Sequence, residues 1–116
     1  MPRVAIVTGS ARGIGRAIAR SLSEAGDTVV ILDTQGAELA AEGMNAEGLH
    51  AMGLTADVSR CEDVNSAFEK VLGRFGRIDV LVNNAAVLGP VANLEDLSEQ
   101  DWDFVMSVDL KSVFLC

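Results

Sequence analysis

Short apolar runs alternate with segments of helical spacing over most of the chain, and this alternation limits the possible folds more than any other feature. The runs cover residues 4–7, 28–32, 50–55 and 78–82. Three of them are almost continuously apolar and rich in β-branched residues, which is typical of strands buried on both faces of a parallel sheet. The run at 50–55 is the weakest because Gly53 interrupts it.

Helical spacing follows each of the first three runs. Apolar residues in 14–25 and in 64–75 share one set of offsets, each lining a single helix face, and 37–44 shows a shorter version of the pattern. A further helix is expected from about Ser98, after the fourth run and a loop. Glycines stand where three of these helices should end, at positions 26, 48 and 76.

Two hydroxyl residues each precede a carboxylate by three positions. Ser59 is followed by Glu62, and Ser98 by Asp101. A serine with a carboxylate at this spacing is typical of a helix N-terminus, because each side chain can bond a free backbone N–H group. We expect Ser59 and Ser98 to be N-caps.

The order of elements predicts an α/β fold. Strands that alternate with helices specify right-handed crossovers and a doubly wound parallel sheet in three layers, here with strands 1–4 and flanking helices. If the strand order is 3-2-1-4, the run at 78–82 has an apolar outer edge that favours aggregation unless it is covered. We therefore expect residues 1–116 to be one domain, truncated at its C-terminal end and part of a longer protein.

Glycines at positions 9, 13 and 15 follow the first run and open the first helical segment. Such a turn lets a pyrophosphate approach the backbone closely, and the helix start offers free N–H groups and the positive end of the helix dipole. Because strand, turn, helix and second strand are all in place, the motif indicates a Rossmann-like dinucleotide-binding domain.

Asp33 ends the second strand, 18 residues after Gly15. This is close to the spacing expected for the carboxylate that binds the adenosine ribose of the cofactor. A carboxylate at this place repels the 2′-phosphate of NADP, so the sequence favours NAD. Arg12 keeps NADP open as an alternative, because a guanidinium beside the turn can bind a 2′-phosphate. A turn-starting Asp and a surface Arg are the structural alternatives for the two residues.

The charge and composition exclude several other functions. The chain has 17 acidic and 9 basic residues, a formal net charge of −8, and no basic stripe, which argues against nucleic-acid binding. No apolar run approaches the ~20 residues of a membrane span, and the start lacks the long apolar core of a signal peptide. Two Cys and one His form no metal-binding pattern. We expect a cytoplasmic protein without a metal.

Four motifs resemble those of the short-chain dehydrogenase/reductase family and occur in the same order. They are Thr8-Gly9-x-x-x-Gly13-x-Gly15, Ala56-Asp57-Val58, Asn83-Asn84-Ala85-Ala86 and Val108-Asp109-Leu110. The family usually has Gly where this chain has Ala86, and Asn where it has Asp109. A methyltransferase shares the β-α-β start but not the last two motifs. The resemblance implies an oxidoreductase that transfers hydride between NAD and a secondary alcohol or ketone.

The resemblance also implies a role for each matching position. The residues at the glycine turn would contact the cofactor phosphates: Gly9, Ser10, Arg12, Gly13, Ile14 and Gly15. Asp33 would bind the adenosine ribose, Asp57 would accept a hydrogen bond from the adenine amino group, and Val58 would contact the adenine. The residues that would border the cofactor after the fourth strand are Asn84, Ala85 and Ala86. For Asp57 a turn-starting role, and for Asn83-Asn84 a polar strand end, remain alternatives.

Asp109 lies among apolar residues of the last predicted helix. Their spacing defines one face of that helix and places Asp109 on it: Trp102, Val105, Met106, Val113 and Phe114. A carboxylate on such a face is costly unless it is paired or functional, the alternative being that it reaches solvent. In the family the Asn at this position bonds a water that links the catalytic Lys to solvent. Asp109 is therefore the candidate catalytic residue, with a charge that would alter this relay.

The resemblance places the remaining catalytic residues beyond these 116 positions. The family uses a Tyr as general acid/base, a Lys four positions later and a Ser that positions the substrate, whereas the chain contains no Tyr. We expect the chain to bind a nicotinamide dinucleotide without turning over substrate by itself. The whole enzyme would act on a small alcohol or carbonyl compound as a homo-oligomer, a tetramer or dimer. The alternative is a stand-alone or catalytically inactive dinucleotide-binding module.

Overall fold

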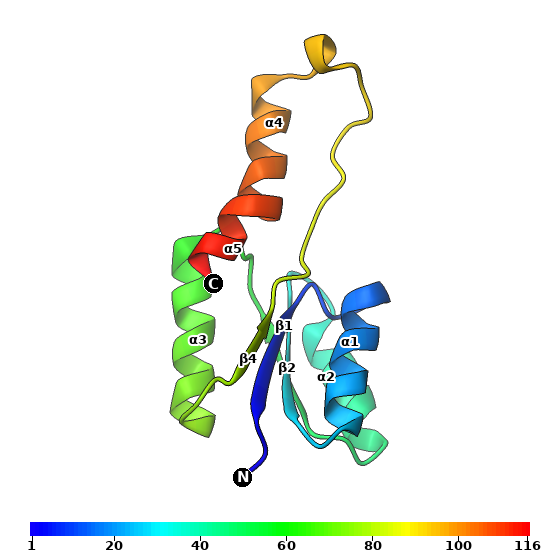
Figure 1. Cartoon of the computed structure of the whole chain (residues 1–116), viewed down its shortest axis with the longest axis vertical. Helices are drawn as coiled ribbons and strands as arrows, with labels where there is room; N and C mark the ends of the chain where they lie inside the picture. Colours follow the sequence, from blue (N-terminus) through cyan, green and yellow to red (C-terminus); the bar gives the residue numbers. More distant parts are fainter.

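A parallel sheet forms the centre of the molecule, with helices on both of its faces (Figure 1). The structure is a computed structural model that describes residues 1–116. The strand order is β3-β2-β1-β4 and every pair is parallel, which confirms the predicted doubly wound α/β fold; the order is the 3-2-1-4 considered above. The elements along the chain are β1 (Val4–Thr8), α1 (Gly13–Glu24), β2 (Thr28–Asp33), α2 (Ala37–Ala46), β3 (Ala51–Thr55), α3 (Cys61–Phe75), β4 (Val80–Val82), a 3-10 turn η1 (Leu94–Asp96), α4 (Glu99–Met106), a π-helical segment η2 (Ser107–Lys111) and α5 (Ser112–Leu115).

The strands are continuously apolar because their alternate side chains enter two separate cores. Ile6 and Val30 lie in the core under α3, whereas Val7 and Ile31 lie in the core under α1 and α2. Figure 1 shows α3 on one side of the sheet, and α1 and α2 on the other. The three-layer arrangement therefore follows from strands that have no polar face to expose.

β4 begins two residues later than the sequence predicts, because the Asp79 side chain takes the place of a strand carbonyl. Asp79 Oδ2 accepts a hydrogen bond from the Val4 N–H at 2.8 Å, and the Asp79 N–H donates to the Val4 carbonyl oxygen at 2.8 Å. Arg77 donates to both carboxylate oxygens, at 2.7 and 2.6 Å. The hydrogen bonds from Arg77, and then that from Val4, hold the pKa of Asp79 below its ordinary value.

Helix α2 packs on one face of β3, and one of its side chains reaches the outer edge of the strand. A Cβ at Gly53 would lie 2.4 Å from the Ala37 carbonyl oxygen, so the first turn of α2 packs directly on the strand backbone. Further along, Asn45 Nδ2 donates to the Ala51 carbonyl oxygen at 2.8 Å, and the Ala51 N–H donates to Asn45 Oδ1 at 2.9 Å. The Asn45 amide thus occupies the pairing groups that an edge strand would offer to another chain.

One predicted helix cap is confirmed and the other is wrong. Ser98 is the N-cap of α4, and its Oγ accepts a hydrogen bond from the Asp101 N–H at 3.0 Å. The N-cap of α3 is Arg60 rather than Ser59. Ser59 donates its hydroxyl and its N–H to Asp57 Oδ1, at 2.6 and 2.9 Å. The Ser59 side chain thus bonds the loop before the helix rather than the first turn of α3.

The loop after β4 and helix α4 form an arm that extends away from the sheet (Figure 1), and the molecule measures 51 × 25 × 19 Å. The predicted apolar face of the last helix is only partly correct, because Trp102, Val113 and Phe114 are exposed whereas Val108 and Ser112 are buried. The π-helical η2 has more residues per turn than an α-helix, so the spacing assumed across it does not hold.

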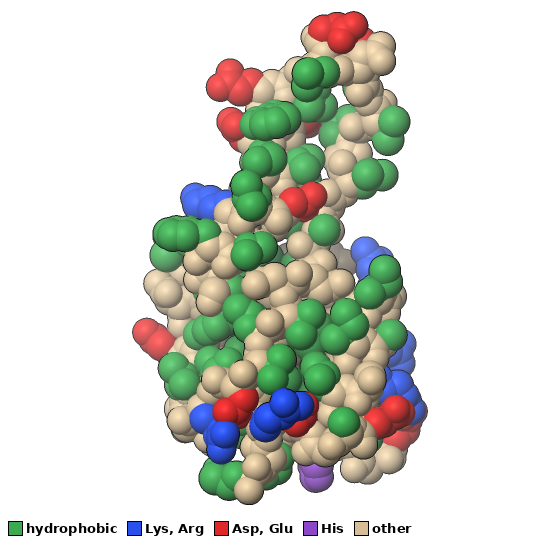
Figure 2. Space-filling model, in the orientation of Figure 1, with side chains coloured by type: hydrophobic (Ala, Val, Ile, Leu, Met, Phe, Trp, Pro, Cys, Tyr) green, Lys and Arg blue, Asp and Glu red, His purple; other side chains and the backbone are tan.

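Apolar side chains gather on the visible face of this arm (Figure 2). The exposed large apolar residues of the arm include Leu88, Val91, Leu94, Trp102 and Phe104. None of the helices combines the length and the apolar character that crossing a membrane would require.

Candidate cofactor-binding site

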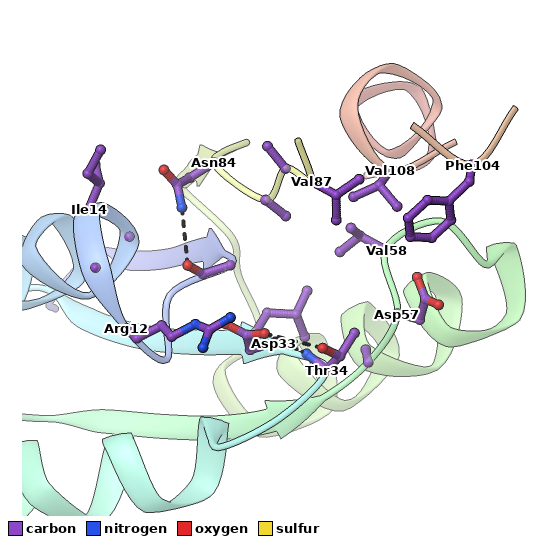
Figure 3. A pocket seen from close by; sticks show the side chains of 17 residues that line it. Arg12, Ile14, Asp33, Thr34, Asp57, Val58, Asn84, Val87, Phe104 and Val108 are labelled. Atoms are coloured by element: carbon purple, nitrogen blue, oxygen red, sulfur yellow. Dashed lines mark hydrogen bonds between the residues drawn. The ribbon is translucent and has the colours of Figure 1, made fainter. Parts of the chain in front are cut away.

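A cavity of about 520 Å³ lies at the carboxyl ends of the strands, where open α/β sheets bind their ligands (Figure 3). Three successive strand-to-helix connections and the segment after β4 contribute to it. The cavity is lined by every predicted cofactor-binding residue except Ser10, that is by Gly9, Arg12, Gly13, Ile14, Gly15, Asp33, Asp57, Val58, Asn84, Ala85 and Ala86.

The glycine turn is shaped for a close approach between backbone segments. Gly9 and Gly13 have φ values of 63° and 62°, which glycine adopts without strain. A Cβ at Gly15 would lie 2.2 Å from the Gly9 carbonyl oxygen and 2.5 Å from Asn84 Nδ2. The start of α1 has no side-chain cap and no acidic residue in its first turn. Its free N–H groups therefore fit an anionic group such as the phosphates of a dinucleotide.

Hydrogen bonds between the ends of β1 and β4 fix the floor of the cavity. Asn84 Nδ2 donates to the carbonyl oxygens of Thr8 and Gly9, both at 3.1 Å. The buried Thr8 Oγ1 accepts hydrogen bonds from the N–H groups of Asn84 and Ala85, each at 3.0 Å. Asn84 therefore holds the glycine turn in place while bordering the cavity itself.

Asp33 is held at the cavity wall by backbone donors. Its Oδ2 accepts a hydrogen bond from the Ala11 N–H at 3.1 Å, and its Oδ1 accepts one from the Thr34 N–H at 2.8 Å. A carboxylate has about four acceptor positions, so Asp33 retains capacity for ribose hydroxyls. Arg12 also lines the cavity, so both groups that bear on the choice between NAD and NADP are present.

Ser10 lies behind the cavity rather than in its wall. The residue is fully buried, its Oγ donates to the Val7 carbonyl oxygen at 2.6 Å, and it accepts a hydrogen bond from the Leu32 N–H at 3.2 Å. The hydroxyl thus braces the turn against β1 and β2. The Ser10 side chain is therefore used inside the protein, and the predicted contact between Ser10 and the cofactor would have to come from its backbone.

The opposite wall contains residues to which the sequence assigned no role. Figure 3 shows Phe104 of α4 and Val108 of η2 projecting toward Val58 and Val87. Asp109 is half-buried, and its Oδ1 accepts a hydrogen bond from the Val87 N–H at 2.7 Å. The carboxylate is therefore paired with backbone and ties the segment after β4 to η2. The π-helical turn that orients these residues left no signal in the apolar spacing.

The chain is similar in sequence to known proteins over almost its whole length. The family model described as short chain dehydrogenase matches residues 3–116. The 3-oxoacyl-(acyl-carrier-protein) reductase FabG of Staphylococcus aureus is 38% identical over 119 residues, covering 100% of this chain and 48% of the relative. The cis-4-hydroxycyclohexanecarboxylate dehydrogenase of Sinomonas cyclohexanicum is 41% identical over 115 residues, covering 98% of this chain and 46% of the relative.

A solved structure has the same fold. The crystal structure of a 3-ketoacyl-ACP reductase from Sinorhizobium meliloti 1021 superposes with a TM-score of 0.93 at 36% sequence identity, over 97% of this chain and 45% of that chain. The chain thus spans about half the length of the curated relatives it matches. With a family model that covers nearly all of it, this chain belongs to the short chain dehydrogenase family.

Proposed function

We propose that this chain is the cofactor-binding part of an NAD-dependent oxidoreductase that interconverts a secondary alcohol and a ketone. The observation that carries the proposal is the composition of the cavity. It brings together the uncapped start of α1, the Asp33 carboxylate at the end of β2 and Asp57 in the loop after β3. Family membership supports a nicotinamide cofactor. The preference for NAD rests on Asp33, whose charge opposes a 2′-phosphate.

The residues present fit the parts of such a cofactor. The N–H groups at the start of α1 would bind the phosphates, Asp33 would bind the adenosine ribose, and Asp57 and Val58 would hold the adenine. When bound, the cofactor supplies the hydride chemistry. The names of two relatives, a 3-oxoacyl reductase and a hydroxycarboxylate dehydrogenase, support a substrate with a hydroxyl or carbonyl group.

We also propose that Asp109 positions one wall of the cavity in this enzyme. Its carboxylate already accepts a hydrogen bond from the Val87 N–H, and Val87 and Val108 both line the cavity. The bond would hold the wall that faces the cofactor. The water relay implied for the Asn of the family remains a prediction for Asp109.

The cofactor preference is tested by replacing Asp33 in the intact protein. We expect the wild type to bind NADH more tightly than NADPH, and Asp33→Ala to weaken NADH binding about tenfold, the effect of losing a charge-assisted hydrogen bond. NADPH binding should not weaken, because the repulsion is removed. Glu42→Ala is the matched control, since it removes one negative charge from an exposed position of α2 outside the cavity.

Isothermal titration of both nucleotides measures these affinities. Tighter binding of NADPH than of NADH to the wild type would contradict the role of Asp33. A stand-alone or catalytically inactive dinucleotide-binding module is the second candidate. It is distinguished by assaying the intact protein for NAD-dependent oxidation of secondary alcohols, which only the first candidate expects. A cytoplasmic location and a homo-oligomeric enzyme stay predictions from the sequence.

A further inference from the structure

The loop between β3 and α3 is held by a side chain from outside it. Residues 56–59 of this loop contribute Ala56, Asp57 and Val58 to the cavity. The Asp57 N–H donates to Asp63 Oδ2 at 2.9 Å. Asp63 belongs to the first turn of α3, six residues further along the chain. The contact therefore links the backbone of a cavity residue to the start of a helix that packs on the sheet.

The other hydrogen bonds of the loop are local or come from the neighbouring strand. The Ala56 N–H donates to the Asp33 carbonyl oxygen at 3.0 Å, and the Arg60 N–H donates to the Asp57 carbonyl oxygen at 3.0 Å. Asp57 Oδ1 accepts hydrogen bonds from Ser59. Ala56 and Val58 are buried on either side of Asp57. Two apolar anchors and the Asp63 carboxylate thus hold the backbone of Asp57, while Ser59 holds its carboxylate.

We infer that Asp63 is a positioning residue for the adenine half of the cofactor, acting through the Asp57 backbone, which is an inference that rests on the proposed function. Asp63 does not line the cavity, so it has no direct contact to offer a ligand there. The other carboxylate oxygen of Asp63 lies 3.9 Å from Arg60 Nε, and this ion pair is long and exposed to solvent. The short hydrogen bond of Asp63 is therefore the one from the Asp57 N–H. A charged acceptor on a backbone N–H is among the stronger hydrogen bonds available to a loop.

Glu62 provides a matched control for this inference. Both acidic residues stand in the first turn of α3, where negative charge stabilises a helix start. Glu62 is exposed, whereas Asp63 is half-buried and bonded to the loop. Removing either charge therefore changes the interaction with the helix dipole similarly, but only the change at Asp63 removes a hydrogen bond from the Asp57 backbone.

The experiment compares NADH with reduced nicotinamide mononucleotide, which lacks the adenosine half, as ligands of the intact protein. We expect Asp63→Ala to bind NADH about tenfold more weakly, because binding must then supply the free energy of ordering Asp57, which one charge-assisted hydrogen bond supplies in the wild type. The same variant should bind the mononucleotide as the wild type does. Asp63→Asn keeps an acceptor oxygen and should restore NADH binding, and Glu62→Ala should leave both affinities unchanged. Titration calorimetry and thermal unfolding of each variant supply the measurements.

The outcomes separate this inference from the proposed function. A wild type that binds no dinucleotide refutes both. A wild type that binds NADH, with Asp63→Ala unchanged or weakened equally for both ligands, overturns only the role of Asp63. If Asp63→Ala does not fold, Asp63→Asn and Asp63→Glu carry the test, because Glu displaces the acceptor by one methylene. We then expect Asp63→Asn to bind NADH as the wild type does, and Asp63→Glu to bind it more weakly. Equal NADH affinities of these two variants would overturn the inference.

Discussion

Gly15 and Gly73 are both helical glycines, but their surroundings differ completely. A Cβ at Gly15 would lie 2.2 Å from the Gly9 carbonyl oxygen, whereas a Cβ at Gly73 would have no neighbour within 4 Å. We expect Gly15→Ala to lower the free energy of unfolding by about 1–3 kcal/mol through overpacking and to abolish dinucleotide binding. Gly73→Ala should raise the free energy of unfolding by roughly 0.5–1 kcal/mol, because alanine loses less backbone entropy in a helix.

Urea unfolding measures both free energies, and the opposite signs make the comparison informative. Equal stability of the two variants would contradict the close approach at Gly15. A Gly15→Ala protein that still binds NADH with wild-type affinity would contradict the assignment of the turn to the cofactor.

Asp79 should make the stability of the protein depend on acid pH. Its pKa is depressed below the ordinary value of 3.8 by Arg77 and by the Val4 N–H. A depressed carboxyl pKa contributes stability that is present above the unfolded-state value and is lost as pH falls through the folded-state value. We expect Asp79→Asn to be less stable than the wild type near neutral pH and to converge with it as pH falls through the folded-state pKa of Asp79, which lies below 3.8.

The free energy of unfolding measured from about pH 7 down to about pH 2 tests this expectation. Asp103→Asn, an exposed acid on α4, serves as the control and should run parallel to the wild type. A wild-type minus Asp79→Asn difference that stays constant with pH would show that the charge of Asp79 does not stabilise the start of β1.

At the scale of elements, the Asn45 side chain should stabilise the outer edge of β3 more than it stabilises α2, the helix to which it belongs. Asn45→Ala removes two hydrogen bonds to Ala51 and exposes pairing groups on the edge of the sheet. We expect a loss of about 1 kcal/mol in the free energy of unfolding, together with faster aggregation. Asn65→Ala on α3 is the control, because its amide makes only a 3.5 Å contact with the Cys61 sulfur. Urea unfolding and light scattering give the two readouts, and equal behaviour of both variants would refute the edge role.

The elements themselves were largely predictable from the sequence, because the strands and helices of the sheet layers obey regular spacing. The apolar runs predicted all four strands. The predictions that fail are those that depend on local competition. The Ser59 side chain bonds Asp57 in the loop instead of capping α3, and the last helix does not keep its apolar face because η2 interrupts the spacing.

The candidate site was also predictable in part, because some of its residues follow regular spacing and others do not. The glycine turn and Asp33 are recognised by spacing alone, and both line the cavity. Phe104 and Val87 come to the cavity through the path of the arm, which no pattern in the sequence encodes. Asp63 was missed because its role passes through the backbone of another residue.

At the scale of the whole molecule, the sheet and the arm should differ strongly in local stability. β1 and β2 are buried on both faces, whereas the arm exposes Leu88, Val91 and Leu94. Backbone amides exchange with solvent through local opening, which needs less free energy where few apolar contacts must break. We expect the slowest hydrogen exchange in β1 and β2 and the fastest in residues 88–95.

Hydrogen exchange of this 116-residue chain, followed by NMR, measures the difference. The amides of α3 provide an internal reference, since that helix packs on the sheet along one face only. Equal protection of the arm and of β1 would contradict this division of stability.

The hydrogen bonds of Asn84 also have a consequence for synthesis on the ribosome. β1 pairs with β2 early in the chain, but the floor of the cavity requires Asn84 to reach back to Thr8, across 76 positions. At translation rates of roughly 5–20 residues per second, the glycine turn waits on the order of seconds for this partner. The first strand and its turn are therefore made long before the pocket they serve, and the edge of β1 that pairs with β4 stays open until β4 emerges.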